Sequence, residues 1–154
     1  MYQITDTYQE LTRELAEFIP SARLLTDELS RLAHGTDASF YRLVPQLVVR
    51  VESEAEVQQV LHSCAQRGLP VTFRAAGTSL SGQAVTDSVL IQLGNGWSGH
   101  QLLDDGAAIR LQPGVIGARA NSILAPLQRK IGPDPASINA CMIGGIAANN
   151  ASGM

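Results

Sequence analysis

The sequence has few charged residues and no excess of positive charge. Charged side chains make up 16% of the 154 residues, and the formal net charge is −3. A chain with this balance has no bulk attraction for nucleic acid or for an anionic membrane surface. The hydrophobic content of 45% is typical of globular chains and excludes a disordered, solvating one.

Long apolar runs and metal-binding patterns are also missing. No run approaches the roughly 18 apolar residues that a membrane-spanning helix needs, and the N-terminus lacks a basic segment followed by an apolar one. Cys64 and Cys141 have no CxxC spacing and the three histidines are scattered, which excludes a zinc site, a c-type haem site and a disulfide framework. We expect a cytoplasmic chain without a transmembrane segment, with peripheral binding at the inner membrane as an alternative.

Apolar periodicity predicts alternating helices and strands in the first half of the chain. Thr7 and Glu10 have the spacing of a capping box at the start of a helix, as do Ser53 and Glu56. Gly68 marks the C-terminal end of the helix that begins at Ser53. The run LVVRV is continuous and β-branched, which suits a strand buried on both faces. The expected elements are helices over 7–19, 27–33 and 53–67, and strands over 47–51, 71–73 and 89–93. The order strand, helix, strand predicts a βαβ unit whose two strands form a parallel pair.

Turn residues dominate the second half, because 12 of the 14 glycines follow residue 76. A hairpin is expected over 101–111, around Asp105 and Gly106, and a helix over 117–130. Arg129 and Lys130 would lie in the last turn of that helix, where the helix dipole favours cations.

A glycine-bearing loop follows the expected strand 71–73, at the strand end where α/β sheets bind ligands. Its sequence, RAAGTSLSG over 74–82, combines glycines with hydroxyl side chains and suits an anion. A Walker A loop is disfavoured because Gln83 and Ala84 stand where its lysine and hydroxyl residue belong. A GxGxxG fingerprint is absent and a GxSxG elbow fails at Ser81. An ordinary polar connection and a phosphate-binding loop remain equal alternatives on spacing alone, and Arg74 is read as a salt-bridge partner.

The stretch from Ile131 to Met154 has one charged residue, Asp134, and many small ones. Gly144 and Gly145, followed by alanines, give a face with little side-chain bulk. Such a face lets another backbone or a flat ring approach closely. Tight internal packing is the alternative interpretation, and it is favoured when this stretch is considered alone.

Taken together, these stretches resemble the FAD-binding fold of the vanillyl-alcohol oxidase and p-cresol methylhydroxylase type. They are most like its branch of D-lactate, glycolate and D-2-hydroxyacid dehydrogenases, which includes forms fused to an iron–sulfur domain. The matching stretches are DASFYR (37–42) with Pro45 and VVRVESEAEV, RAAGTSLSG (74–82), QPGV (112–115), GPDPAS (132–137) and CMIGGIAANNASG (141–153). Ser79 and Ile146 depart from the family pattern, in which a glycine and an asparagine are common at these positions.

The resemblance implies an α+β fold, with a small parallel βαβ subdomain and the beginning of a second, mainly antiparallel subdomain. Residues 1–36 would form an N-terminal helical segment, and 37–154 would form an incomplete FAD-binding domain. Thr78 stands where some members carry a histidine bound covalently to the flavin, so the FAD is expected to be noncovalent. The implied cofactor-binding residues are Ala76, Gly77, Thr78, Ser79, Leu80, Ser81, Gly82, Pro133, Asp134, Ser137, Gly144, Gly145, Asn149, Asn150 and Ser152.

The resemblance also implies a reaction for a longer protein of which this chain would be the N-terminal part. A 2-hydroxyacid would transfer hydride to FAD, and the electrons would pass to an acceptor such as an iron–sulfur cluster in a missing C-terminal region. No catalytic residue and no metal ligand is expected in this chain, which should be inactive alone and should self-associate through exposed apolar surface. The alternative is a non-catalytic module that binds nucleotide or phosphate or mediates an interaction.

Overall fold

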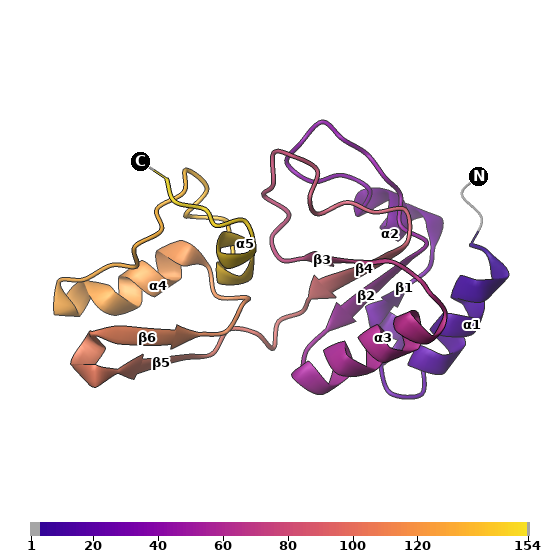
Figure 1. The fold of residues 1–154 in the computed structure, drawn as a ribbon, viewed down its shortest axis with the longest axis horizontal. Helices are drawn as coiled ribbons and strands as arrows, with labels where there is room; N and C mark the ends of the chain where they lie inside the picture. The colour runs from indigo at the N-terminus through magenta and orange to yellow at the C-terminus, as the bar shows by residue number, and fades with distance from the viewer. Residues whose placement is uncertain (1–3, 154) are drawn as a thin grey trace. The chain divides into compact units, whose positions relative to one another are not determined.

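The computed structural model describes residues 4–153, and these group into two compact units (Figure 1). The first unit holds the described residues up to Arg74 together with Ser79–Gly94. The second unit holds Ala75–Thr78 and the described residues from Asn95 onward.

A four-stranded sheet organises the first unit, in the order β1-β2-β4-β3 (Figure 1). The strands are β1 (Leu24–Leu25), β2 (Leu47–Val51), β3 (Val71–Arg74) and β4 (Val89–Leu93). β2 and β3 both run parallel to β4, and β1 runs antiparallel to β2. This confirms the expected strands and the small parallel sheet.

Two helices pack against one face of this sheet, namely α1 (Asp6–Leu15) and α3 (Glu54–Gln66) (Figure 1). Alternate residues of the strands face these helices, as the period of two in a strand requires. The core cluster is formed by Leu11, Leu15, Ile19, Leu24, Leu47, Val49, Val51, Val60, Cys64, Val89 and Ile91. Val48 and Leu90, on the opposite face, are also fully buried, so both central strands are buried on both sides, as predicted for 47–51.

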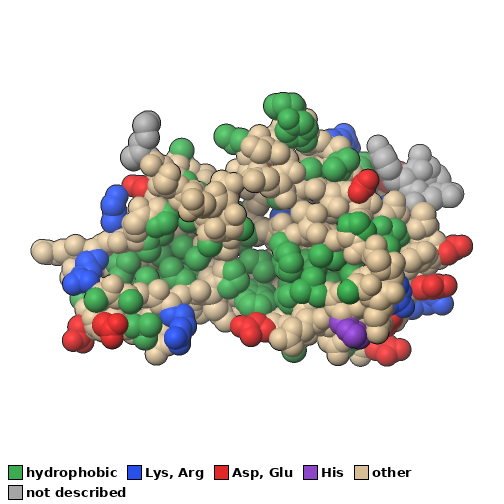
Figure 2. Space-filling model, in the orientation of Figure 1, with side chains coloured by type: hydrophobic (Ala, Val, Ile, Leu, Met, Phe, Trp, Pro, Cys, Tyr) green, Lys and Arg blue, Asp and Glu red, His purple; other side chains and the backbone are tan. Residues whose placement is uncertain are grey.

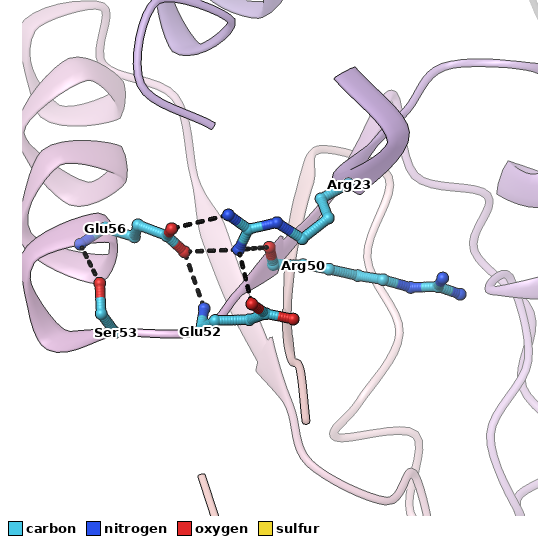
Figure 3. A network of polar contacts seen from close by, with 5 residues as sticks. All are labelled: Arg23, Arg50, Glu52, Ser53 and Glu56. Atoms are coloured by element: carbon cyan, nitrogen blue, oxygen red, sulfur yellow. Dashed lines mark hydrogen bonds and ion pairs between the residues drawn. The ribbon is translucent and has the colours of Figure 1, made fainter. Parts of the chain in front are cut away.

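The N-terminus of α3 is fixed by its cap and by an arginine from outside the sheet (Figure 3). Ser53 is the N-cap, and its Oγ accepts from the Glu56 backbone N–H at 3.2 Å. The Glu56 carboxylate accepts from both terminal nitrogens of Arg23 at 2.8 Å and from the Glu52 N–H at 2.7 Å. The hydrogen bonds from Arg23 hold the pKa of Glu56 below its ordinary value. This network fastens the segment before β1 to the start of α3.

Two expectations for the first unit need correction, and a third is confirmed. The strands 47–51 and 71–73 are not a pair, because β4 lies between β2 and β3 and hydrogen-bonds to both. The predicted helix 7–19 ends at Leu15, and its N-cap is Thr5, so the capping box of Thr7 and Glu10 is wrong. The shorter helix is confirmed as α2 (Glu28–Ala33), whose N-cap Asp27 accepts from the Ser30 N–H.

The second unit contains an antiparallel hairpin and two helices (Figure 1). The hairpin joins β5 (His100–Leu103) to β6 (Ala108–Leu111) through a turn at Asp104–Gly106, as predicted. The helices are α4 (Gly117–Leu124) and α5 (Ile143–Ala148), and α5 was not expected. On the face drawn in Figure 2, hydrophobic side chains cover broad areas, and most charged side chains lie toward the edges of the view.

The predicted helix 117–130 is too long. The α-helix ends at Leu124, a single 3₁₀ turn follows around Pro126, and Gln128 adopts a left-handed conformation with φ of 55°. Because proline has no N–H to donate, the helical ladder cannot continue through it. Arg129 therefore lies beyond the helix, where it donates to the Gly106 carbonyl oxygen at 3.1 Å, and Lys130 does not cap the helix either.

Candidate functional site

The glycine-bearing loop leaves the carboxyl end of β3 and leads into β4 without a helix between them. Gly77 and Gly82 have φ of 70° and 69°, a region that residues with a side chain rarely adopt. Gly82 also lies against an aromatic ring, since a Cβ built on it would be 2.8 Å from Cδ2 of Tyr41. Both glycines are therefore required by the conformation of the loop.

Most backbone donors of this loop have no protein acceptor. Within the part of the chain that the structure describes, this holds for the N–H groups of Ala76, Gly77, Thr78, Leu80 and Gly82. Their residues are partly exposed and not buried, so a ligand or water can reach them. Backbone N–H groups next to glycines with positive φ are a common means of binding phosphate oxygens. The loop contains no carboxylate that would repel an anion.

Ser79 shapes the second half of the loop. Its Oγ accepts from the backbone N–H groups of Ser81 and Gln83 at 3.1 and 3.4 Å, and it donates to Oε1 of Gln83 at 2.9 Å. A hydroxyl at this position thus closes a local turn, which a glycine could not do. The departure from the family pattern at Ser79 is compatible with an ordered loop.

Among the residues that the structure describes, Arg74 has no salt-bridge partner, contrary to expectation. Its Nη1 donates to the carbonyl oxygens of Thr36 at 2.7 Å, His34 at 3.3 Å and Ala84 at 3.5 Å. Burial lowers the pKa of Arg74, and the charge of Asp37 opposes that shift. Nη1 of the guanidinium is therefore engaged with backbone carbonyl groups at the base of the loop.

The second candidate stretch is closed on itself. The Asp134 N–H donates to the Ser152 carbonyl oxygen at 2.7 Å, so its two ends lie side by side. The Asp134 carboxylate accepts from Nζ of Lys130 at 2.9 Å. Between these two residues, the Ser137 carbonyl oxygen forms a turn by accepting from the backbone N–H groups of Ala140 and Cys141. The structure thus brings Asp134 and Ser152 together within one unit.

The two glycines of α5 differ in their surroundings. A Cβ on Gly144 would be 2.9 Å from Cβ of Pro113, so tight packing explains this glycine. Gly145 is exposed, and a Cβ on it would meet only Cβ of Ala75, at 3.9 Å. Ile146, in contrast, is buried beside Gly117. Tight packing therefore explains Gly144, whereas Gly145 has space beside it.

One face of α5 is left free of bulky side chains. Gly145, Ala148 and Asn149 are exposed and lie three or four residues apart, which places them on the same side of the helix. Asn150 follows with φ of 47°, and its N–H donates to Ala147 O while the next N–H donates to Ile146 O. This pair of bonds is a Schellman ending of the helix, so Asn150 has a structural role at the C-terminus.

Other kinds of site are not found among residues 4–153. In that range, no group of three or more His, Cys, Asp or Glu side chains could hold a metal ion. No helix of the described chain has the length and apolar character to cross a membrane. Burial raises the pKa of the Cys64 thiol to about 11, which makes it a poor nucleophile at neutral pH.

Sequence comparison identifies the domain to which these features belong. The profile of a family described as "FAD binding domain" matches residues 45–154. Glycolate oxidase subunit GlcD of Escherichia coli strain K12 is 34% identical over 143 residues, covering 91% of this chain and 29% of the relative. D-lactate dehydrogenase of Anaerostipes hadrus is 29% identical over 164 residues, covering 99% of this chain and 33% of the relative. The chain thus spans about a third of the length of these proteins.

Solved structures with the same fold include alkyldihydroxyacetonephosphate synthase, with a TM-score of 0.79 and 22% identity over 95% of this chain and 30% of the other. p-Cresol methylhydroxylase has a TM-score of 0.67 and 13% identity over 81% of this chain and 26% of the other. These likenesses confirm the α+β fold class, with its parallel and antiparallel sheets, and the resemblance to p-cresol methylhydroxylase-type flavoproteins.

Proposed function

Because the chain belongs to the FAD-binding domain family, we propose that it holds the FAD of a flavin-dependent 2-hydroxyacid dehydrogenase. Residues 37–154 would be the FAD-binding part, preceded by a helical segment over 1–36. The observation that carries the proposal is the loop after β3, where most backbone N–H groups have no acceptor among residues 4–153 and two glycines have positive φ. These N–H groups would bind the pyrophosphate without a metal ion.

The proposed FAD-contacting residues form two sets. In the loop they are Ala76, Gly77, Thr78, Ser79, Leu80, Ser81 and Gly82. In the second stretch they are Pro133, Asp134, Ser137, Gly144, Gly145, Asn149, Asn150 and Ser152. The exposed side of α5 at Gly145 is the part of the second set that best suits a flat ring or its ribityl chain, because no side chain there blocks close approach.

Noncovalent binding follows from the residue types. Thr78 offers a hydroxyl in place of the histidine that attaches flavin in some members of the fold, and an alcohol of this kind does not form that bond. When bound, FAD would supply the acceptor for the hydride that leaves the α-carbon of the hydroxyacid. The chain's own part is to bind and orient the cofactor.

The substrate class rests on the relatives' names, which are glycolate oxidase, D-lactate dehydrogenase and D-2-hydroxyglutarate dehydrogenase. All three name a 2-hydroxyacid. The base that takes the hydroxyl proton, and any iron–sulfur acceptor, would lie in the longer protein. We propose that the 154-residue chain alone does not oxidise substrate, and D-lactate oxidation by the purified chain would contradict this.

Titration with FAD tests the proposal. The protein should quench flavin fluorescence at a one-to-one ratio, and Gly77→Trp should abolish the quenching. Gly68→Trp is the matched control, because Gly68 has a similar φ of 62° with nothing within 4 Å and lies before β3, at its other end. A wild-type protein that neither quenches flavin fluorescence nor gains thermal stability from FAD would contradict the proposal.

ADP distinguishes the alternative function. A module that recognises nucleotide or phosphate alone should bind ADP as tightly as FAD. A flavoprotein should bind FAD far more tightly, because the isoalloxazine and ribityl groups add contacts that ADP lacks. Equal affinities would therefore favour the non-catalytic module.

A further inference from the structure

A carboxylate of the segment before β2, that of Asp37, reaches the base of the proposed FAD loop. Asp37 accepts from the Ser39 N–H at 2.8 Å and from the Ser39 hydroxyl at 2.5 Å through Oδ1. Its other oxygen, Oδ2, accepts from the Ala84 N–H at 3.3 Å. Asp37 therefore joins a turn at 37–39 to Ala84, two residues after the loop 74–82.

Arg74 binds the carbonyl side of Ala84, whose N–H is bound by Asp37. Its Nη1 donates to the Ala84 carbonyl oxygen at 3.5 Å and to the Thr36 carbonyl oxygen at 2.7 Å. Arg74 is the last residue of β3 and Ala84 is buried, so these bonds close the loop at its two ends. Thr36 also pairs with Arg42 in an isolated antiparallel bridge, which braces the segment that carries Asp37.

We propose that Asp37 and Arg74 are positioning residues. Asp37 binds the N–H of Ala84 and Arg74 binds its carbonyl oxygen, and together they hold the loop in the shape that binds the FAD pyrophosphate. This inference rests on the proposed function and deepens it. Neither side chain is assigned to the ligand itself, since the polar atoms described above are engaged with backbone groups and Ser39. Preorganised donors bind an anion more tightly because the loop loses little freedom on binding.

Charge balance is a second part of the inference. A free carboxylate close to the loop would repel a diphosphate, but the Asp37 carboxylate is met by donors from Ser39 and Ala84 and lies in the field of Arg74. Burial alone would raise the pKa of Asp37, and these hydrogen bonds and the nearby charge outweigh it and keep the carboxyl ionised. Removal of Arg74 would take away the positive charge that offsets this carboxylate beside the loop.

The arrangement predicts which substitution rescues the loop. All three carbonyl oxygens meet one nitrogen of Arg74, so a single ammonium can replace much of what the guanidinium does. We expect Arg74→Gln to raise the dissociation constant for FAD about tenfold, the effect of one lost hydrogen bond to a charged group. Arg74→Lys should recover most of the affinity. Asp37→Asn should also weaken binding, because its amide presents a donor where Oδ1 or Oδ2 now accepts.

Arg67→Gln is the matched control. Arg67 pairs with Glu14 between α3 and α1, so its loss destabilises the same unit without touching the loop. Fluorescence titration with FAD and thermal unfolding of the apoprotein are measured for every variant. We expect Arg67→Gln to lower the melting temperature and leave the FAD dissociation constant unchanged.

The outcomes separate the inference from the proposed function. Failure of the wild-type protein to bind FAD would refute the proposed function. FAD binding by Arg74→Gln with wild-type affinity, in a protein that binds FAD, would refute the positioning role alone. Equal loss of affinity in Arg74→Gln and Arg67→Gln would show a merely structural effect and would also overturn it, as would failure of Arg74→Lys to rescue.

Discussion

Replacing Glu56 with glutamine should lower the free energy of unfolding by about 2 kcal/mol at pH 7, within the range for hydrogen bonds to charged groups. The carboxylate accepts three hydrogen bonds, two from Arg23 and one from the Glu52 N–H (Figure 3). The side chains of Arg23 and Glu56 are only 19% and 17% exposed, so water replaces these bonds poorly. A glutamine would point an NH₂ group at a donor. Urea unfolding followed by circular dichroism measures the loss.

Its pH dependence follows from the direction of the pKa shift. Because Arg23 lowers the pKa of Glu56 below its ordinary value of 4.5, the carboxylate stabilises the protein above that pH. This contribution disappears as the pH falls through the lowered pKa. The difference between wild type and Glu56→Gln should therefore be full at pH 7 and shrink progressively below pH 4.5.

Glu52→Gln is the control for this prediction. Glu52 lies 3.7 Å from the same arginine but is 44% exposed, so its loss should cost less than about 1 kcal/mol. If the two variants were equally destabilised, or if the loss at Glu56 did not depend on pH, the partly buried ion pair between Arg23 and Glu56 would not be what holds the start of α3 in place.

Three further predictions concern the loop, the core and a thiol. Gly82→Ala should lower the free energy of unfolding by about 1 to 2 kcal/mol, because the alanine would need φ near 69° and its Cβ would clash with Tyr41. Gly132→Ala is the control, because Gly132 lies in open space, and it should be neutral in the same urea assay. Ile91→Ala should cost about 2 to 5 kcal/mol, because the side chain is 0% exposed at the centre of the sheet, and a loss under 1 kcal/mol would contradict that placement. At pH 8 the native Cys64 thiol, with a pKa of about 11, should resist labelling by Ellman's reagent that is rapid after unfolding.

Local pattern predicted the elements of the first unit well. The β-branched run 47–51, the apolar run 89–93 and the stripe of α3 have the period or continuity of their element, and packing did not override it. The order of the strands in the sheet cannot be predicted from local sequence pattern. The chain visits β2, β3 and β4 in sequence, and only the hydrogen bonds between strands place β4 in the middle. A βαβ pattern fixes the parallel direction and leaves open whether another strand is inserted.

Helix ends in the second unit show a different limit. Apolar residues at helical spacing continue past Leu124, but Pro126 and the left-handed Gln128 end the helix there. Pro126 by itself indicates that the helix ends close to this position. The short helix α5 is unexpected because glycine is a poor helix former. Its ending at Asn150, and the packing of Gly144 on Pro113, hold it in place.

The candidate site was predictable where it depends on backbone and less so where it depends on side chains. Glycine at positions 77 and 82 is itself a sign of positive φ, and the loop conformation that this allows leaves backbone N–H groups of the described loop without protein acceptors. Side chains that looked available in the sequence are engaged within the chain, since Asp134 binds Lys130. Recognition of FAD in the proposed function therefore falls mainly to main-chain donors, which explains how a loop with Ser79 in place of glycine can keep the family's role: backbone donors depend on the shape of the loop, and Ser79 supports that shape.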